Sequence, residues 1–503
     1  MTLLAVLMAG AAVGEALLFR EPAPVPGVRS LTFKERVEVR IDAAQTVRVT
    51  CPDAAAVGWV RRHLQAWFGF SPRVEAVSAE PTVPADEGYR LRADANGVSI
   101  EAKTLAGVRY ALYTLRQIAE RDSSGETVAY YRLPELTIED APAMRFRGVH
   151  FCWFPEQSAA AIERQIRVAA MLKFNYVVLE SWGVFRSARH PWFGWKDGPM
   201  TRAALDRLRA AADDLGVTLI PQLNVWGHAA AARSTSGKHA ALDVSPERQS
   251  LFEPGGGEGV SQGACWNWCL SNPAARQVVR DLVEEMHEAF GRPPFFHIGC
   301  DEAEKPTCAN CRATPYARLV ADHIAAIAGM LKARGARTMM WHDMLLLRGD
   351  PRWKGFYANG GEETSRLPTL LPKDIVVCDW YYGGVPESKD YPTLAYFSSE
   401  CRFDTLTCPW NNLDGIRAQT RYAGEHGLFG TLCTTWHHFG GMRMAHIMLR
   451  SACGAWGGNE KGSGAGAYAV LYRQAGWDMG DAAGGYRDSG WTDAQVTREI
   501  IPD

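Results

Sequence analysis

Residues 295–302 read Phe-Phe-His-Ile-Gly-Cys-Asp-Glu, an apolar run that ends in glycine, cysteine and two adjacent carboxylates. The stretch from Pro293 to Ile298 predicts a short buried strand. Because a strand alternates its side chains, Asp301 and Glu302 must point in different directions beyond its end. Two carboxylates in unlike environments can hold unlike protonation states, one as an acid and one as an anion. Cleavage of a glycosidic bond needs this combination.

The alternation of a short strand with a helix extends over most of the chain around this segment. The predicted strands are Gly148–Trp153, Tyr176–Glu180, Thr218–Asn224, Phe295–Gly299, Thr338–Trp341, Ile375–Trp380, Thr405–Cys408 and Leu428–Thr434. Helical periodicity lies between most of them, for example over residues 159–172, 202–215, 274–290 and 316–334. Eight such units predict an α/β fold, a (β/α)8 TIM barrel over residues 143–457.

A barrel of this kind carries its site at the C-terminal ends of the strands. Polar or aromatic residues follow nearly every predicted strand, and we expect them to converge in one mouth. They are Trp153, Glu180, His228, Asp301, Glu302, Trp341, Asp343, Trp380, Tyr381, Trp410, Trp436 and His437. This convergence favours an enzyme more than any single motif does.

The remaining segments divide the chain further. Residues 28–142 predict a small α/β accessory domain, with a hairpin around Asn96-Gly97 and a helix over residues 104–118. Residues 458–503 predict a C-terminal tail with one helix. Residues 1–20 resemble a signal peptide, although no Lys or Arg precedes the apolar core. We therefore expect a secreted or periplasmic protein, or a cytoplasmic one if this segment is not a signal.

Composition excludes several classes of partner. The chain has 503 residues, 47% of them hydrophobic and 22% charged, with a net charge of -2, so nothing indicates a nucleic-acid partner. No apolar run beyond the start is long enough to span a membrane. The 17 tryptophans suit a pocket for a carbohydrate, whose C–H faces stack on aromatic rings. The oligomeric state is left open.

The 12 cysteines do not decide the redox compartment. Cys308 and Cys311 follow the carboxylate pair closely, and Cys265 and Cys269 lie upstream. A structural zinc, a disulfide and free buried thiols are all compatible with this spacing. For the reaction itself we expect no cofactor and no metal, since no cluster of histidines gathers at the strand ends.

Several motifs resemble glycoside hydrolase family 20, the exo-acting β-N-acetylhexosaminidases. Residues 297–302 match its His-x-Gly-x-Asp-Glu pattern, and Trp226-Gly-His228 matches a second motif. Asp140-Ala-Pro142 at the domain junction and Lys173-Phe-Asn175 before the second strand also match. The variant Ile-Gly-Cys-Asp-Glu is closer to the hexosaminidase D branch.

The resemblance implies substrate-assisted retention, in which the 2-acetamido oxygen of the sugar attacks its own anomeric carbon. Glu302 would be the acid and then the base, and Asp301 would orient the acetamido N–H. His228 would hydrogen-bond Glu302 and be oriented by Glu180. The implied substrate-binding residues are Trp341, Trp380, Trp436, Trp410, Asp343, His438 and either Tyr381 or Tyr382, between which the sequence does not choose.

Two departures from the family pattern affect specificity. The family places an arginine shortly after the first strand, whereas residues 150–156 contain none. The family also often has a glutamate two residues after the last tryptophan, where this chain has His438. The choice between β-GlcNAc, β-GalNAc and a sulfated sugar therefore stays open, as do the linkage and the aglycone. A barrel glycosidase of other specificity and a non-catalytic carbohydrate-binding barrel are the alternatives.

Overall fold

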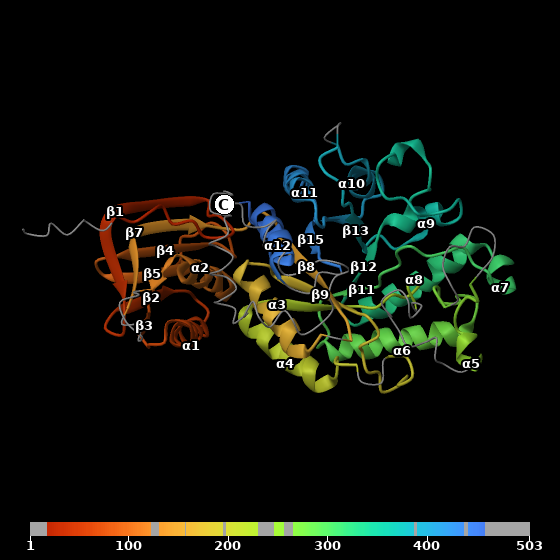
Figure 1. Cartoon of the computed structure of the whole chain (residues 1–503), viewed down its shortest axis with the longest axis horizontal. Helices are drawn as coiled ribbons and strands as arrows, with labels where there is room; N and C mark the ends of the chain where they lie inside the picture. The colour runs from red at the N-terminus through yellow and green to blue at the C-terminus, as the bar shows by residue number, and fades with distance from the viewer. Residues whose placement is uncertain are drawn as a thin grey trace, which may run out of the picture. The chain divides into compact units, whose positions relative to one another are not determined.

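The computed structural model describes residues 18–121, 130–155, 157–194, 198–229, 246–255, 265–386, 390–436 and 441–457. Most of the predicted signal peptide, the predicted C-terminal tail and His438 lie outside these residues. The chain forms two compact units (Figure 1), one over Val28–Asp140 and one from Ala141 onward that also includes Pro24–Gly27. None of the helices in the described ranges is long and apolar enough to cross a membrane.

The first unit is a mixed sheet with two helices. Its elements are β1 (Ser30–Ile41), β2 (Thr46–Thr50), α1 (Ala56–Phe68), β3 (Arg73–Ala76), β4 (Tyr89–Asp94), β5 (Gly97–Ala102), α2 (Leu105–Ile118), β6 (Glu120–Arg121) and β7 (Tyr131–Asp140). The strand order is β1-β7-β4-β5-β2-β3, with β6 beside β7. The predicted hairpin is β4 paired antiparallel with β5, and α2 packs on both of these strands.

The second unit is a closed barrel of eight parallel strands, so the predicted fold class is confirmed. The strands are β8 (Phe146–Trp153), β9 (Tyr176–Ser181), β10 (Thr218–Gln222), β11 (Phe295–His297), β12 (Arg337–Trp341), β13 (Val376–Trp380), β14 (Asp404–Cys408) and β15 (Gly430–Thr434). The barrel closes where β15 pairs with β8, joining Thr434 to His150 in register. Every residue of β8 and β13 is buried, as expected for strands covered on both faces.

Helices connect successive strands. They are α3 (Ala159–Met171), α4 (Arg202–Leu215), α5 (Pro246–Gln249), α6 (Pro273–Ala289), α7 (Ala309–Arg312), α8 (Tyr316–Ala333), α9 (Leu367–Leu370), α10 (Pro392–Ala395), α11 (Leu413–Glu425) and α12 (Gly441–Trp456). The residues before α3, α4, α6 and α11 are Ser158, Thr201, Asn272 and Asn412, and each side chain accepts a hydrogen bond from the first turn. Local sequence thus sets where these helices begin.

The barrel interior is filled by side chains from all eight strands. Phe146, Val178, Ile220, Phe295, Met339, Trp341, Val376, Cys378, Leu406 and Leu432 are among the buried residues of this core. Because the interior is packed, a ligand of this barrel would bind at the mouth formed by the strand ends and not between the strands.

Candidate active site

A cavity of about 210 Å³ lies where the strands of the barrel end. Its walls come from residues that follow β9, β10, β11, β13, β14 and β15. They are Trp182, His228, Asp301, Glu302, Trp380, Tyr382, Trp410 and Trp436. Pockets for drug-sized molecules usually measure about 300–1,000 Å³, so this cavity is on the scale of a single sugar residue.

The two carboxylates lie in different environments, as the alternation argument requires. The Asp301 side chain is 9% exposed and that of Glu302 is 50% exposed. The backbone turns sharply to achieve this, because Gly299, Cys300 and Glu302 have φ of 66°, 78° and 44°. A Cβ atom on Gly299 would overlap the side chain of Asn224, so only glycine fits there. Left-handed backbone at Cys300 and Glu302 is strained, and such strain is concentrated at functional sites.

His228 joins the two carboxylates. Its Nε2 atom lies 3.2 Å from Glu302 Oε2 and 3.4 Å from Asp301 Oδ2. The loop after β10 comes close enough because Gly227 has no side chain, since a Cβ there would overlap the carbonyl oxygen of Asp301. The ring of Trp266 packs against the imidazole with centroids 4.1 Å apart, and its indole N–H donates to the Glu302 carbonyl oxygen at 2.8 Å.

Asp343 supports the site from behind. The carboxylate accepts hydrogen bonds from the Glu302 backbone N–H at 3.0 Å, from Asn359 Nδ2 at 2.8 Å and from Trp380 Nε1 at 3.3 Å. The side chain is fully buried, and burial raises the pKa of this carboxyl group above its ordinary value. One buried group therefore sets the position of both the Glu302 backbone and the Trp380 wall.

Aromatic rings form the rest of the pocket. Trp380 stacks on Tyr382 with ring centroids 5.1 Å apart. The Tyr382 hydroxyl accepts a hydrogen bond from Trp436 Nε1 at 2.6 Å. Burial raises the pKa of Tyr382 well above its ordinary value, so the hydroxyl keeps its proton and can act as a donor.

Four of the residues predicted from sequence do not line this cavity. Trp341 is fully buried one layer deeper, where its ring lies 4.3 Å from that of His297 and 5.5 Å from that of Trp436. Asp343 does not face the cavity; its carboxylate binds the backbone of Glu302 and the indole of Trp380, which do. Tyr381 stacks on Phe356, because neighbouring residues of an extended chain face opposite ways and Tyr382 takes the inward direction.

Glu180 is the fourth of these residues. Its carboxylate bonds to His150 Nε2 and Asn224 Nδ2, both at 3.1 Å, inside the barrel. The predicted contact with His228 is replaced by the contacts of that histidine with Asp301 and Glu302. The reason is the inward direction of Glu180 near the end of β9, where it is 1% exposed.

Sequence reasoning missed two residues of the site. Trp182 lines the cavity and directly follows β9, so its place after a strand was an available signal. Trp266 contacts both His228 and Glu302 from a segment far from any strand end. No local pattern marks such a residue, because only the folded chain brings residues 265–269 to the mouth.

A (β/α)8 barrel whose mouth holds paired carboxylates within tryptophan walls is typical of enzymes that cleave glycosidic bonds. Two family models match the chain, "Glycosyl hydrolase family 20, domain 2" over residues 22–141 and "Glycosyl hydrolase family 20, catalytic domain" over residues 161–382. The chain belongs to glycoside hydrolase family 20, as its motifs predicted.

Curated relatives are similar at moderate identity. The chain is 28% identical over 275 residues to a beta-hexosaminidase of Porphyromonas gingivalis, covering 49% of this chain and 34% of that protein. It is 27% identical over 300 residues to a beta-N-acetylhexosaminidase of Cellulomonas fimi, covering 55% and 54%. The matched region thus spans between a third and about half of the length of these relatives.

Solved structures share the fold. The beta-N-acetylhexosaminidase from Bacteroides fragilis has a TM-score of 0.65 at 17% identity, over 93% of this chain and 100% of that one. The corresponding enzyme from Streptomyces coelicolor has a TM-score of 0.62 at 18% identity, over 94% and 100%.

Proposed function

We propose that this protein is a retaining exo-β-N-acetylhexosaminidase that removes terminal β-GlcNAc or β-GalNAc from glycans. The main support is the pairing of Asp301 and Glu302 in a cavity for one sugar. Among the described residues that line the cavity, these are the only carboxylates. Ordinary retaining glycosidases place two carboxylates about 5–5.5 Å apart across the scissile bond, whereas a substrate that supplies its own nucleophile needs no such partner.

The mechanism follows from these positions. The acetamido carbonyl oxygen bonds to the anomeric carbon while the bond to the leaving oxygen breaks, and Glu302 transfers its proton to that oxygen. Asp301 accepts a hydrogen bond from the acetamido N–H and stabilises the positive charge of the oxazolinium intermediate. Glu302, now a carboxylate, takes a proton from water as the water attacks the anomeric carbon, and the bond between that carbon and the acetamido oxygen breaks to restore the acetamido group. Retention results from the two successive displacements.

The supporting residues orient these groups. His228 holds both carboxylates through one nitrogen, which favours a fixed arrangement over free rotation of Glu302. Of the two tyrosines that the sequence left open, we assign Tyr382 to the acetamido oxygen, because it lines the cavity and Tyr381 does not. Trp380 and Trp436 would enclose the acetamido methyl and the sugar face, in place of the deeper Trp341.

Two features of the sequence bear on which sugar the pocket accepts. The absence of arginine from residues 150–156 and the presence of His438 support contacts to the 3-, 4- and 6-hydroxyls that differ from the common family pattern. The Ile-Gly-Cys-Asp-Glu segment supports a place near the hexosaminidase D branch. A galacto-configured or substituted sugar is compatible with both observations.

Release of nitrophenol from a panel of β-glycosides tests the proposal. We expect turnover of β-GlcNAc, β-GalNAc or 6-sulfo-β-GlcNAc derivatives and none of the β-glucoside, which lacks the acetamido nucleophile. Cleavage of the β-glucoside at a similar rate would indicate a glycosidase with a protein nucleophile. Binding of N-acetyl sugars without turnover of any substrate would indicate a carbohydrate-binding barrel.

A further inference from the structure

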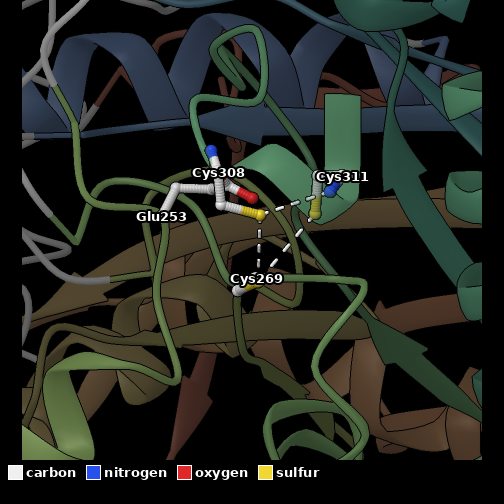
Figure 2. A group of neighbouring side chains, drawn as sticks. All are labelled: Glu253, Cys269, Cys308 and Cys311. Carbon is white, nitrogen blue, oxygen red and sulfur yellow. Dashed lines mark hydrogen bonds between the residues drawn. The ribbon is translucent and has the colours of Figure 1, made fainter. Parts of the chain in front are cut away.

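A group of three cysteines and one glutamate lies on the loops beside the catalytic carboxylates, outside the sugar pocket. Figure 2 shows Glu253, Cys269, Cys308 and Cys311 directed toward one another. Glu253 follows α5, Cys269 precedes α6, and the other two lie at the start of α7. One possible ligand atom from each residue lies within 4.8 Å of all the others.

The spacing of the sulfur atoms matches a metal site better than a disulfide. Cys269 Sγ lies 3.6 Å from Cys308 Sγ and 3.9 Å from Cys311 Sγ. A tetrahedral zinc ion with Zn–S bonds of about 2.3 Å places its sulfur ligands about 3.8 Å apart. A disulfide needs a separation of about 2.05 Å, and all twelve cysteines of the chain are free thiols in this structure.

Glu253 supplies the fourth ligand position. The residue is 4% exposed, and its Oε2 atom accepts hydrogen bonds from Cys308 N at 2.7 Å and Thr307 N at 2.8 Å. Its Oε1 atom is buried and accepts no hydrogen bond from a described N–H or O–H group, and the Cys311 thiol is the group that interacts with this carboxylate. A thiol is only a weak donor, and a bound cation would satisfy the buried oxygen better.

Backbone amides around the sulfur atoms complete the arrangement. Cys311 N donates to Cys308 Sγ at 3.3 Å, within a Cys-x-x-Cys spacing that suits zinc. Ser271 N donates to Cys311 Sγ at 3.4 Å. Such outer contacts orient ligating groups and stabilise thiolates.

We propose that Glu253, Cys269, Cys308 and Cys311 bind one Zn²⁺ ion in a closed tetrahedral structural site. Three thiolates and a carboxylate suit zinc rather than calcium or magnesium, which prefer oxygen ligands alone. All four positions are protein ligands, so the ion has no open position and takes no part in sugar cleavage. Cys265, which the sequence grouped with Cys269, is replaced in the cluster by Glu253.

The site would fix the loop that carries the acid. Cys308 lies six residues after Glu302, and Asn267 holds the intervening Glu304 by two backbone hydrogen bonds of 2.7 and 3.1 Å. Zinc would therefore join the loop of residues 302–308 to the segment of residues 265–269, in which Trp266 contacts His228. The ion thereby stabilises the geometry of the pocket from outside it.

Metal analysis of the purified full chain tests the proposal. Protein prepared with zinc and without chelator should contain about one zinc per chain, and Cys308→Ser and Cys311→Ser should lose it. Glu253→Gln should weaken zinc binding by at least about tenfold. Cys265→Ser is the matched control, because this cysteine is buried in the same segment as Cys269 but outside the cluster, and the variant should retain full zinc content.

Cobalt and thiol measurements on the unaltered chain decide the matter if the variants do not fold. Cobalt-substituted protein should show thiolate-to-cobalt charge-transfer absorption in the near ultraviolet. All twelve cysteines should react as free thiols in denaturant with chelator. Absence of both zinc and the cobalt absorption would overturn the proposal, and ten reactive thiols would show a disulfide in place of the metal.

Discussion

Replacing Asp343 by alanine tests whether its buried carboxylate holds the backbone of Glu302 in position. The buried carboxylate accepts hydrogen bonds from the Glu302 backbone, Asn359 and Trp380 at 3.0, 2.8 and 3.3 Å. A buried donor that loses its acceptor costs about 1–3 kcal/mol, and Trp380 Nε1 is such a donor, whereas the other two are partly buried and can turn to water. Glu302 also loses the bond that holds its backbone at φ 44°, a conformation that costs about 1–3 kcal/mol for a residue other than glycine. We therefore expect Glu302 to relax away from its position.

The loss should appear in both rate and stability. A displacement of a catalytic group by about 1 Å lowers the rate about 100-fold, so we expect kcat on an aryl β-N-acetylglucosaminide to fall by about that factor in Asp343→Ala. Urea unfolding should show a loss of about 1–3 kcal/mol, since Trp380 Nε1 is left as a buried donor while the other two donors are only partly buried. Asp343→Asn keeps one acceptor oxygen and should lie between this variant and the unaltered protein.

Asp140→Ala is the matched control for this experiment. Asp140 is also a buried carboxylate, and it accepts hydrogen bonds from Arg29 N at 3.2 Å and Tyr89 Oη at 2.9 Å in the N-terminal unit. The Asp140→Ala substitution should lower the stability of the protein and leave kcat of the folded enzyme unchanged. A folded Asp343→Ala with normal kcat, or an equal loss of kcat in Asp140→Ala, would refute the positioning role.

Four further predictions concern the reacting groups and the pocket wall. Glu302→Gln should lower turnover of unactivated glycosides by about 10²–10⁴-fold and that of aryl glycosides with good leaving groups less, whereas an equal loss on both would remove Glu302 from the acid role. Asp301→Asn should reduce mainly kcat, because its charge acts in the transition state, and a near-normal kcat would contradict substrate assistance. A thiazoline analogue of the cyclised intermediate should inhibit far better than the free N-acetyl sugar, as measured by competition. Trp380→Ala should weaken the thiazoline more than the monosaccharide, and equal weakening would exclude Trp380 from the wall around the acetamido group.

The barrel strands were predictable because each is a short apolar run with polar or aromatic residues after it. The structure moves their ends by only a few residues, as for the predicted 338–341 and the observed Arg337–Trp341. Strands β1 and β7 of the N-terminal unit were not predicted. Residues 37–41 of β1 and 136–139 of β7 do alternate, so part of the signal was available. A run of three charged residues, 34–36, interrupts the alternation of β1 where its pairing with β7 shifts register, and Pro134 interrupts that of β7.

The sequence by itself determined the fold class, the family and the pair of Asp301 and Glu302. The hydrophobic periodicity of each segment, the order of strands and helices and the short motif at residues 297–302 can all be read along the chain without knowing the fold. Only the tertiary structure decided which of the residues after the strands face the ligand. Trp341 is a core residue and Trp182 a wall, because the direction of each side chain depends on how its strand enters the barrel. Glu253 likewise joins the cysteines through the folding of distant loops, which no spacing in the sequence records.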